Sequence, residues 1–506
     1  MIAAHQPAIA GDAQAARALV LAGGGMRVAY QAGAVKALLE SGMRFAHADA
    51  ASGGTINLAA LLSGVDIDRL CQRWRALKVR KFASLRPARD YFRAARMASL
   101  GDADGLLQHV YPTLGIEIDK LRAATGIQAS FNVCRFDDKT VVALPHTQLD
   151  MPRLVAAASL PMLMPAVQAD GSCWTDAVWI KDANLLACVE RGARELWLVW
   201  CIGNTPVWRD GLFNQYVHMI EMSAIGALNA ELAAIAAINA RIAAGETVHG
   251  HTQAISVHII KPEVPLPLDP DFYFGRINAA TLIAMGYRDA HRAMQQPASP
   301  LDPSATRMRE PGLGVSFRET MAGDFVLGVD KPPVAQITAT LAMHATVHID
   351  DIAAFVADPQ HKAGLTGHID FPPLGMSIPA QNGVFGLFSP SGDPALRYMV
   401  YELAFRLDGQ AYYLAGKKHV KLGGPWKLWP ETTTLYTTLH AGEDASAAVI
   451  GAGVLRLGVV ELLRLLSTVH ATHAATGWQA AGAITTFFRF FAGQLARTYL
   501  LRRPAG

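Results

Sequence analysis

Ser52 is the residue of this sequence that is best placed to act as a nucleophile. It lies in the run Ala50-Ala51-Ser52-Gly53-Gly54, between a strand-like segment and a helical segment that passes through Ile56. Small residues two positions before and after a serine let a strand and a helix pack closely, and the sharp turn between them exposes the hydroxyl. Ala50 stands where such a turn usually has its first glycine. A Ser-Gly-Gly run alone is more often an ordinary turn.

A glycine loop near the start of the chain could bind a negative charge. The run Gly23-Gly24-Gly25 follows a predicted strand, Arg17–Ala22, and precedes a predicted helix, Met26–Ser41. Glycine backbones approach a ligand closely, and a helix N-terminus adds partial positive charge. The loop therefore suits a phosphate or the oxyanion of an acyl intermediate. Val28 interrupts a G-x-G-x-x-G pattern and no Lys-Ser/Thr pair follows, which makes a nucleotide the weaker alternative.

Asp176 is the candidate general base, because it ends a short predicted strand and could lie against the serine. A carboxylate in that place could accept the proton of the attacking hydroxyl. An isolated aspartate is more often a turn residue or a helix cap. Asp182 competes for the role, and a cap before Asn184 is its simpler interpretation. His146 could complete a Ser-His-Asp triad, but no motif surrounds it and we expect it at the surface.

Taken in order, these pieces resemble the patatin-like phospholipase family, over residues 15–295. The matching positions are Gly23, Gly24, Gly25, Arg27 and Gly33 in the first element, Ser52, Gly53, Gly54 and Asn57 in the second, and Ala158, Ser159, Pro165 and Asp176 in the third. Val28, Ala50 and Ala177-Val178 replace glycines of the family pattern. These replacements motivate an alternative reading, a catalytically weak patatin-like protein that binds lipid.

The resemblance implies a serine acyl hydrolase, that is, a phospholipase A, a lysophospholipase or a lipid esterase. It implies a dyad of Ser52 as nucleophile and Asp176 as base, without a catalytic histidine. The N–H groups of Gly23, Gly24 and Gly25 would form the oxyanion hole, with Arg27 as electrostatic support. Ala50, Gly53 and Gly54 would shape the nucleophile elbow. No cofactor and no metal ion are expected. The histidines at 249 and 251 are read as loop residues, because no carboxylate or cysteine lies near them at ligand spacing.

The order of predicted elements indicates two domains. Strands and helices alternate up to residue 294, which favours a parallel or mixed sheet covered on both faces. The resemblance makes this an α/β/α sandwich. Residues 295–312 hold four prolines and are predicted as a linker. Residues 313–506 are predicted as a β-rich domain, a barrel or a sandwich, that ends in helices. Asn382-Gly383 and Asp408-Gly409 are predicted hairpin turns, and Thr485–Arg503 is a predicted helix whose phenylalanines pack on the β domain.

Composition narrows the function classes. The chain has 506 residues, of which 51% are hydrophobic and 17% charged, as in globular proteins. Its formal net charge of +3 is too small to argue for nucleic-acid binding. The five cysteines show no zinc-site spacing, so we expect reduced and mostly buried thiols. Neither a signal peptide nor a charge-free apolar stretch of about 18 residues is apparent. A cytoplasmic protein with peripheral membrane contact and a lipid ester substrate is expected.

Overall fold

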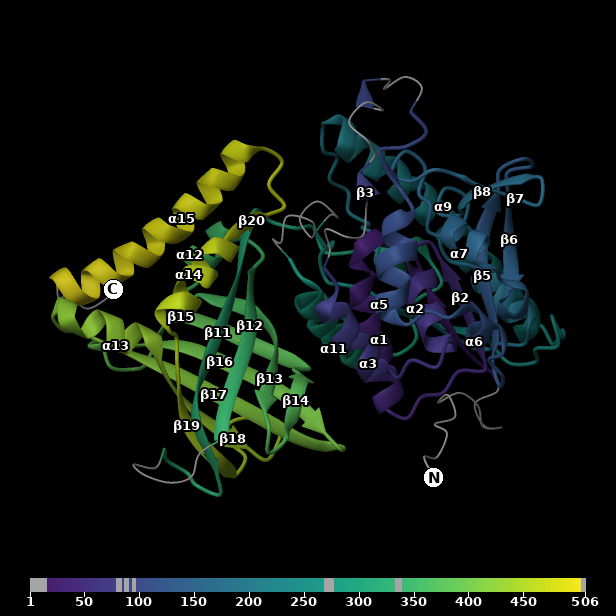
Figure 1. The fold of residues 1–506 in the computed structure, drawn as a ribbon. Coiled ribbons are helices and arrows are strands. Elements are labelled where there is room, and N and C mark those ends of the chain that lie inside the picture. The colour runs from purple at the N-terminus through teal and green to yellow at the C-terminus, as the bar shows by residue number, and fades with distance from the viewer. Residues whose placement is uncertain are drawn as a thin grey trace. The chain divides into compact units, whose positions relative to one another are not determined.

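The computed structural model divides the chain into two compact units, Met1–Glu310 and Pro311–Gly506 (Figure 1). It describes residues 16–78, 84–85, 91–92, 97–267, 277–332 and 339–501. Each unit has its own hydrophobic cores and is described separately.

A mixed sheet forms the centre of the first unit, with the strand order β10-β9-β1-β2-β5-β8-β7 and β6 beside β5. Five strands run parallel: β1 (Arg17–Leu21), β2 (His47–Ala51), β5 (Gln128–Arg135), β9 (Glu195–Val199) and β10 (Ser256–Ile260). Three pair antiparallel: β6 (Thr140–Pro145), β7 (Val167–Ala169) and β8 (Ser172–Asp176). The carboxyl ends of β1 and β2 therefore lie side by side, which brings the glycine loop next to Ser52.

Helices cover both faces of this sheet, as predicted. Leu19 and Leu21 of β1 join a core with one set of helices, and Ala18 and Val20 join a second core on the other face, because successive side chains of a strand alternate in direction. The first face carries α1 (Ala29–Glu40), α2 (Gly54–Leu62), α3 (Ile67–Ala76) and α11 (Ala279–Met294), and the second carries α8 (Leu185–Glu190) and α9 (Leu212–Ala243). Further short helices of this unit include η2 (Gly25–Val28), α5 (Tyr111–Leu114), α6 (Ile118–Arg122) and α7 (Met151–Ala157). The predicted α/β/α arrangement is confirmed.

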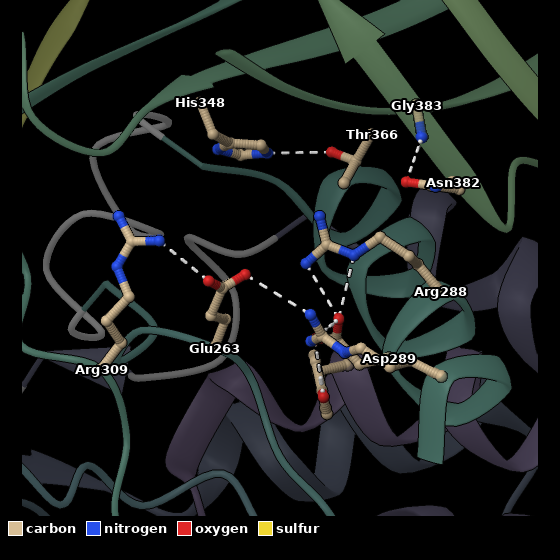
Figure 2. Close-up of polar contacts among 10 residues, drawn as sticks. Glu263, Arg288, Asp289, Arg309, His348, Thr366, Asn382 and Gly383 are labelled. Carbon is tan, nitrogen blue, oxygen red and sulfur yellow. Dashed lines mark hydrogen bonds and ion pairs between the residues drawn. The ribbon is translucent and has the colours of Figure 1, made fainter. Parts of the chain in front are cut away.

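Two glycines allow α1 and α11 to cross in backbone contact. A methyl group on Gly33 would lie 2.0 Å from the Ile283 carbonyl oxygen, and one on Gly286 would lie 1.9 Å from that of Tyr30. Beside this crossing, Asp289 pairs with arginines of its own helix, and Figure 2 shows how Glu263 links this group to Arg309. The match of Gly33 to the family pattern thus has a packing reason.

Helix α9 has two different halves. Its later part packs into the core through Leu228, Leu232 and Ile235, and the carboxylate of Glu231 accepts the N–H of Leu186 at 2.7 Å. Its earlier part exposes Leu212 and Met219. By length and composition alone, α9 is long and apolar enough to cross a membrane. The sequence-based expectation excluded a membrane span because it counted only charge-free stretches, and it interpreted this helical stretch as a core helix.

The second unit is built around a closed antiparallel barrel of eight strands. Around it the order is β11-β12-β13-β15-β16-β17-β18-β19, and pairing between β12 and β13 joins the two ends of the sheet path. The strands are β11 (Gly314–Leu327), β12 (Ala339–Ile349), β13 (Lys362–Phe371), β15 (Asn382–Pro390), β16 (Leu396–Leu407), β17 (Gln410–Lys421), β18 (Thr434–His440) and β19 (Val449–Arg456). The short strands β14 (Gly375–Pro379) and β20 (His470–Thr472) add to β13 and β11. A barrel, one of the two predicted forms, is confirmed.

The two predicted hairpin turns had different outcomes. Asp408-Gly409 joins β16 to β17 as a two-residue turn, with φ of 50° and 80°, as a type I′ turn requires. Asn382-Gly383 is not a turn, and that prediction was wrong. These residues begin β15 and pair with Leu403 and Ala404 of β16, while the Asn382 side chain accepts the Gly383 N–H (Figure 2).

Helices gather at one end of the barrel in Figure 1, among them α13 (Leu428–Thr433), α14 (Val459–Thr468) and α15 (Gly477–Ala496). The short helix α12 (Ile352–Ala357) also belongs to this unit. Phe487 of α15 is buried in the barrel core, and Phe490 and Phe491 pack against it. The interpretation of the C-terminal helix as packed on the β domain is confirmed.

Candidate active site

Ser52 occupies a strained turn between β2 and α2. It follows Ala51, the last residue of β2, and has a φ of 49°, a left-handed conformation that residues other than glycine seldom adopt. The Ser52 carbonyl oxygen accepts the N–H of Thr55 at 3.0 Å and its hydroxyl at 2.6 Å. These bonds hold the turn at the start of α2. The strand–turn–helix geometry predicted from the sequence is therefore present.

Gly53 and Gly54 allow the start of α2 to lie against the glycine loop and the end of β1. A methyl group on Gly54 would lie 2.3 Å from the Leu21 carbonyl oxygen, and one on Gly53 would lie 2.7 Å from that of Gly25. Ala50 is fully buried, and its carbonyl oxygen accepts the side-chain N–H of Asn132 at 3.0 Å. Its methyl group is thus accommodated where the family pattern has glycine.

Asp176 lies within hydrogen-bond distance of the serine. Ser52 Oγ donates to Asp176 Oδ2 at 2.6 Å, although the two residues are 124 positions apart. The other carboxylate oxygen accepts the Val178 N–H at 2.9 Å. The carbonyl oxygen of Ser159 holds the end of this strand in place, because it accepts the Asp176 N–H at 3.1 Å and the Thr175 hydroxyl at 2.8 Å. This hydrogen bond comes from the backbone N–H of Val178 and does not depend on the side chain. The replacement of the family's glycines by Ala177 and Val178 therefore does not alter it.

The environment of this pair favours a proton on the carboxylate. Asp176 is 1% exposed and Ser52 is 7% exposed. Burial raises the pKa of Asp176 to about 7, while the hydrogen bonds from Ser52 and Val178 lower it, because a low-polarity surrounding disfavours the charged form. A carboxylate with this pKa can both take up and release a proton near neutral pH.

The carboxylate of Asp182 contacts the glycine loop, a contact that the sequence did not reveal. Both of its carboxylate oxygens accept the Gly23 N–H at 3.0 Å. Asn184, not Asp182, is the N-cap residue of α8, so the cap interpretation was wrong. The Gly23 N–H therefore already donates to Asp182. Of the three glycines predicted to bind an oxyanion, only Gly24 and Gly25 remain as candidates. Burial and the neighbouring Asp176 hold the pKa of Asp182 well above its usual range.

Residues 19–187 match the family model described as Patatin-like phospholipase. This part of the chain is a patatin-like domain. Among solved structures, that of VipD from Legionella pneumophila matches at 13% identity over 57% of this chain and 68% of that chain, with a TM-score of 0.29. No curated protein matches the chain significantly. The suspected family is thereby confirmed for the segment that holds Ser52, Asp176 and the glycine loop.

Polar side chains fix the elbow of the patatin-like domain to its first helix. Asn57 donates to the Val28 carbonyl oxygen at 2.8 Å and to the Gln31 side chain at 3.1 Å, and it accepts the Trp74 indole N–H at 2.8 Å. Arg27 donates to the Gly24 carbonyl oxygen at 2.9 Å, which ties its side chain to the loop. Burial raises the pKa values of Asp182 and of the Cys201 thiol, and the positive charge of Arg27 offsets part of that rise. Arg27 thus lies beside the glycine loop, as predicted.

The histidines named from the sequence do not complete a triad in the patatin-like domain. His146 is buried rather than exposed, and its two ring nitrogens lie 3.3 Å and 3.1 Å from the carbonyl oxygens of Ala129 and Ala124. His251 is buried as well, with Nε2 at 2.9 Å from the Val189 carbonyl oxygen, and His249 lies in a turn with a φ of 48°. All five cysteines are free thiols, and all except Cys173 are buried.

One group in the second unit could hold a metal ion. His344, His368 and Asp370 each offer a ligand atom within 4.8 Å of the others. The two histidines are direct partners on β12 and β13, and their rings stack at 4.6 Å. Asp370 also accepts the Ser377 N–H at 2.6 Å. Strand register alone creates this group, so the residue spacing gave no signal for it.

Proposed function

We propose that the patatin-like domain is a serine acyl hydrolase that acts on lipid esters, with Ser52 as nucleophile and Asp176 as base. The observation that carries the proposal is the 2.6 Å hydrogen bond from Ser52 Oγ to Asp176 within a strained elbow. A nucleophile and a base within hydrogen-bond reach are the geometric requirement for covalent catalysis. The family match to residues 19–187 supports a lipid substrate.

In the first half of the reaction, Ser52 Oγ attacks the ester carbonyl carbon and its proton passes to Asp176 Oδ2. The carbonyl oxygen becomes an oxyanion, and the backbone N–H groups of Gly24, Gly25 and Gly53 are the donors proposed to bind it. The tetrahedral intermediate then collapses. The alcohol leaves with the proton from Asp176, and the acyl group stays on Ser52 as an ester.

In the second half, water replaces the alcohol. Asp176 accepts a proton from the water as its oxygen attacks the acyl carbon, and the same donors bind the second oxyanion. Collapse releases the fatty acid and returns the proton to Ser52. Asp182 has a positioning role in this scheme, because its bonds to the Gly23 N–H hold the glycine loop beside Ser52.

Exposed apolar side chains lie on the elements around the dyad and support a lipid substrate. They form a set, called the apolar rim here, of Met162, Ile180, Leu212, Phe213 and Met219. Met162 belongs to the loop after Ser159, and Ile180 follows Asp176 by four residues. Helix α9 contacts both segments, since Tyr216 donates to the Pro161 carbonyl oxygen and Ser223 to that of Trp179. Exposed apolar groups that cluster near a site are typical of contact with a lipid surface.

The test of the proposal is labelling with a fluorescent fluorophosphonate, which reacts with activated serines. The wild-type protein is expected to be labelled, and Ser52→Ala is expected to show no labelling at any time point. Ser63→Ala is the matched control, because Ser63 is buried in the same domain and bonds only to backbone groups. A folded wild type that is not labelled would favour the alternative, a patatin-like protein that binds lipid without turnover.

The apolar rim predicts a difference between aggregated and soluble substrates. We expect Leu212→Glu/Met219→Glu to lower the hydrolysis of phosphatidylcholine vesicles by about 10-fold. In the wild type both apolar side chains would enter the lipid surface, and each substitution replaces one of them with a charge. Hydrolysis of a short soluble p-nitrophenyl ester should change by less than about twofold, since neither residue contacts the dyad. The control is Met376→Glu, because Met376 on β14 is also an exposed methionine. Equal losses on both substrates would contradict the rim as a docking surface.

A further inference from the structure

The barrel unit contains a cavity of about 210 Å³ between inward-facing strand residues and the helices α13, α14 and α15. Its wall is almost wholly apolar and includes Phe317, Phe385 and Met399 from the strands and Leu466 and Phe488 from the helices. An eight-stranded barrel is either filled by its own side chains or holds one small ligand. Here the interior is incompletely filled where α13, α14 and α15 meet the strands, and Figure 1 shows these helices gathered at one end of the barrel.

Three polar side chains from the strands line this apolar cavity. Glu319 of β11, Tyr401 of β16 and Lys418 of β17 point inward from strands whose neighbouring inward positions are core residues. Lys418 Nζ lies 2.8 Å from Glu319 Oε1, and the Tyr401 hydroxyl donates to Glu319 Oε2 at 2.7 Å. β11 and β16 lie opposite each other around the barrel, so the contact crosses its interior. The Glu319 and Lys418 side chains are 2% and 3% exposed.

This group can serve a ligand through Lys418. An ammonium has three N–H donors, and the bond to Glu319 uses one of them. Both carboxylate oxygens of Glu319 already accept a hydrogen bond. The cavity therefore offers donors within an apolar wall, and its buried charges sum to zero.

We propose that this cavity binds a single-chain lipid whose polar end is an uncharged hydrogen-bond acceptor, such as a hydroxyl or an ester. The chain lies along the apolar wall toward the helices, and the polar end accepts an N–H of Lys418. A carboxylate end is disfavoured, because it would bring a second buried anion beside Glu319, and an isolated buried charge is costly. This site does not rest on the activity of Ser52.

Helix α14 supports a lipid as the occupant. Leu462, Leu465 and Leu466 line the cavity from one side of this helix. Val459, Val460 and Leu463 are 55% to 62% exposed on the same helix. An amphipathic helix normally exposes mainly polar residues, whereas α14 exposes these three apolar side chains beside Arg464, which fits an apolar surrounding outside the helix as well as the cavity inside. A lipid that enters past α14 meets apolar contacts throughout.

The test uses the intact protein and 1-decanol, which no ester hydrolase can consume. Isothermal titration is expected to give saturable binding with one site per chain, and decanoate at pH 8 should bind at least 10-fold more weakly. Leu466→Glu is expected to weaken decanol binding at least 10-fold, because it places a charge at the cavity wall. Leu463→Glu is the matched control on the same helix. Leu463 is more exposed than Leu466 and does not line the cavity, so the affinity of Leu463→Glu for decanol should stay within twofold of the wild-type value.

Two further variants keep the result decisive. Phe488→Glu tests the wall from α15, should Leu466→Glu prove unfolded by circular dichroism. The double variant Glu319→Gln/Lys418→Met removes the ion pair without leaving one charge alone, and it should weaken decanol about 5-fold or more. The proposal is overturned if decanol shows no saturable binding, if Leu463→Glu loses as much affinity as Leu466→Glu, or if decanoate binds as tightly as decanol.

Discussion

Asp176→Asn is expected to lower the turnover of an ester substrate by about 10³-fold while making the folded protein more stable above neutral pH. An amide has nearly the same shape as the carboxylate and keeps hydrogen bonds to Ser52 and to the Val178 N–H. It cannot accept the proton of the serine, and a positioned general base contributes roughly 10²–10⁴-fold. The measurement is kcat/KM for a soluble p-nitrophenyl ester, which in the wild type should rise with pH through a midpoint near 7.

The gain in stability follows from the raised pKa of Asp176, which goes from 3.8 to about 7 on folding. Above pH 7 the folded wild type must hold an ionised carboxylate in a buried place, whereas the unfolded chain ionises it freely above about pH 4. The folded state therefore binds more protons between pH 4 and 7, and the wild type loses stability as the pH rises through this window. The full effect is of the order of 4 kcal/mol, at about 1.4 kcal/mol for each pKa unit.

Urea unfolding at pH 8 and at pH 5 would measure this effect. The difference in unfolding free energy between Asp176→Asn and wild type should be largest at pH 8 and should shrink at pH 5. Asp49→Asn is the matched control, because burial raises the pKa of Asp49 to about 7 and its carboxylate bonds to Ser130 and Asn132 instead of Ser52. It should gain stability with turnover changed by less than about threefold. A destabilised Asp176→Asn at pH 8, or a gap that does not depend on pH, would contradict the argument.

Much of the first unit could be predicted because its signals are local. The glycine loop, the elbow around Ser52 and the alternation of strands and helices all depend on neighbours in the chain. The end of a predicted strand made Asp176 a candidate, but only the order of motifs in a known family paired it with Ser52, since 124 residues separate the two. The confirmed α/β/α layers follow from short strands buried along nearly their whole length, such as β1 and β9, that alternate with helices, which is the pattern of a sheet covered on both faces.

What could not be predicted depends on strand register and on long-range packing. Asp182 reaches Gly23 across 159 residues, and no local pattern distinguishes it from a helix cap. His344 meets His368, and Glu319 meets Lys418, only because the barrel closes in one register. Asn382-Gly383 has the composition of a turn, but pairing with β16 places it in a strand. In each case the tertiary contact overrides the local preference.

A second large effect is expected from Gly54→Ala, which adds one methyl group to the nucleophile elbow. That methyl would lie 2.3 Å from the Leu21 carbonyl oxygen and 2.7 Å from that of Ala22. Both are backbone atoms at the end of β1, so neither can rotate away as a side chain could. The start of α2 must move instead. Ser52 is two residues away and would move with it, and a misplacement of about 1 Å can cost 10²-fold in rate.

We therefore expect Gly54→Ala to lower turnover and the rate of fluorophosphonate labelling by about 10²-fold, and to lower the free energy of unfolding by roughly 1–3 kcal/mol. Gly226→Ala is the matched control, because a methyl group on this glycine of α9 meets no atom within 4 Å. It should leave turnover unchanged and raise stability by about 0.5–1 kcal/mol, as alanine restricts the unfolded chain. Normal labelling of Gly54→Ala would show that the elbow tolerates a wider turn, and the close packing of α2 on the glycine loop would then have no role in placing Ser52.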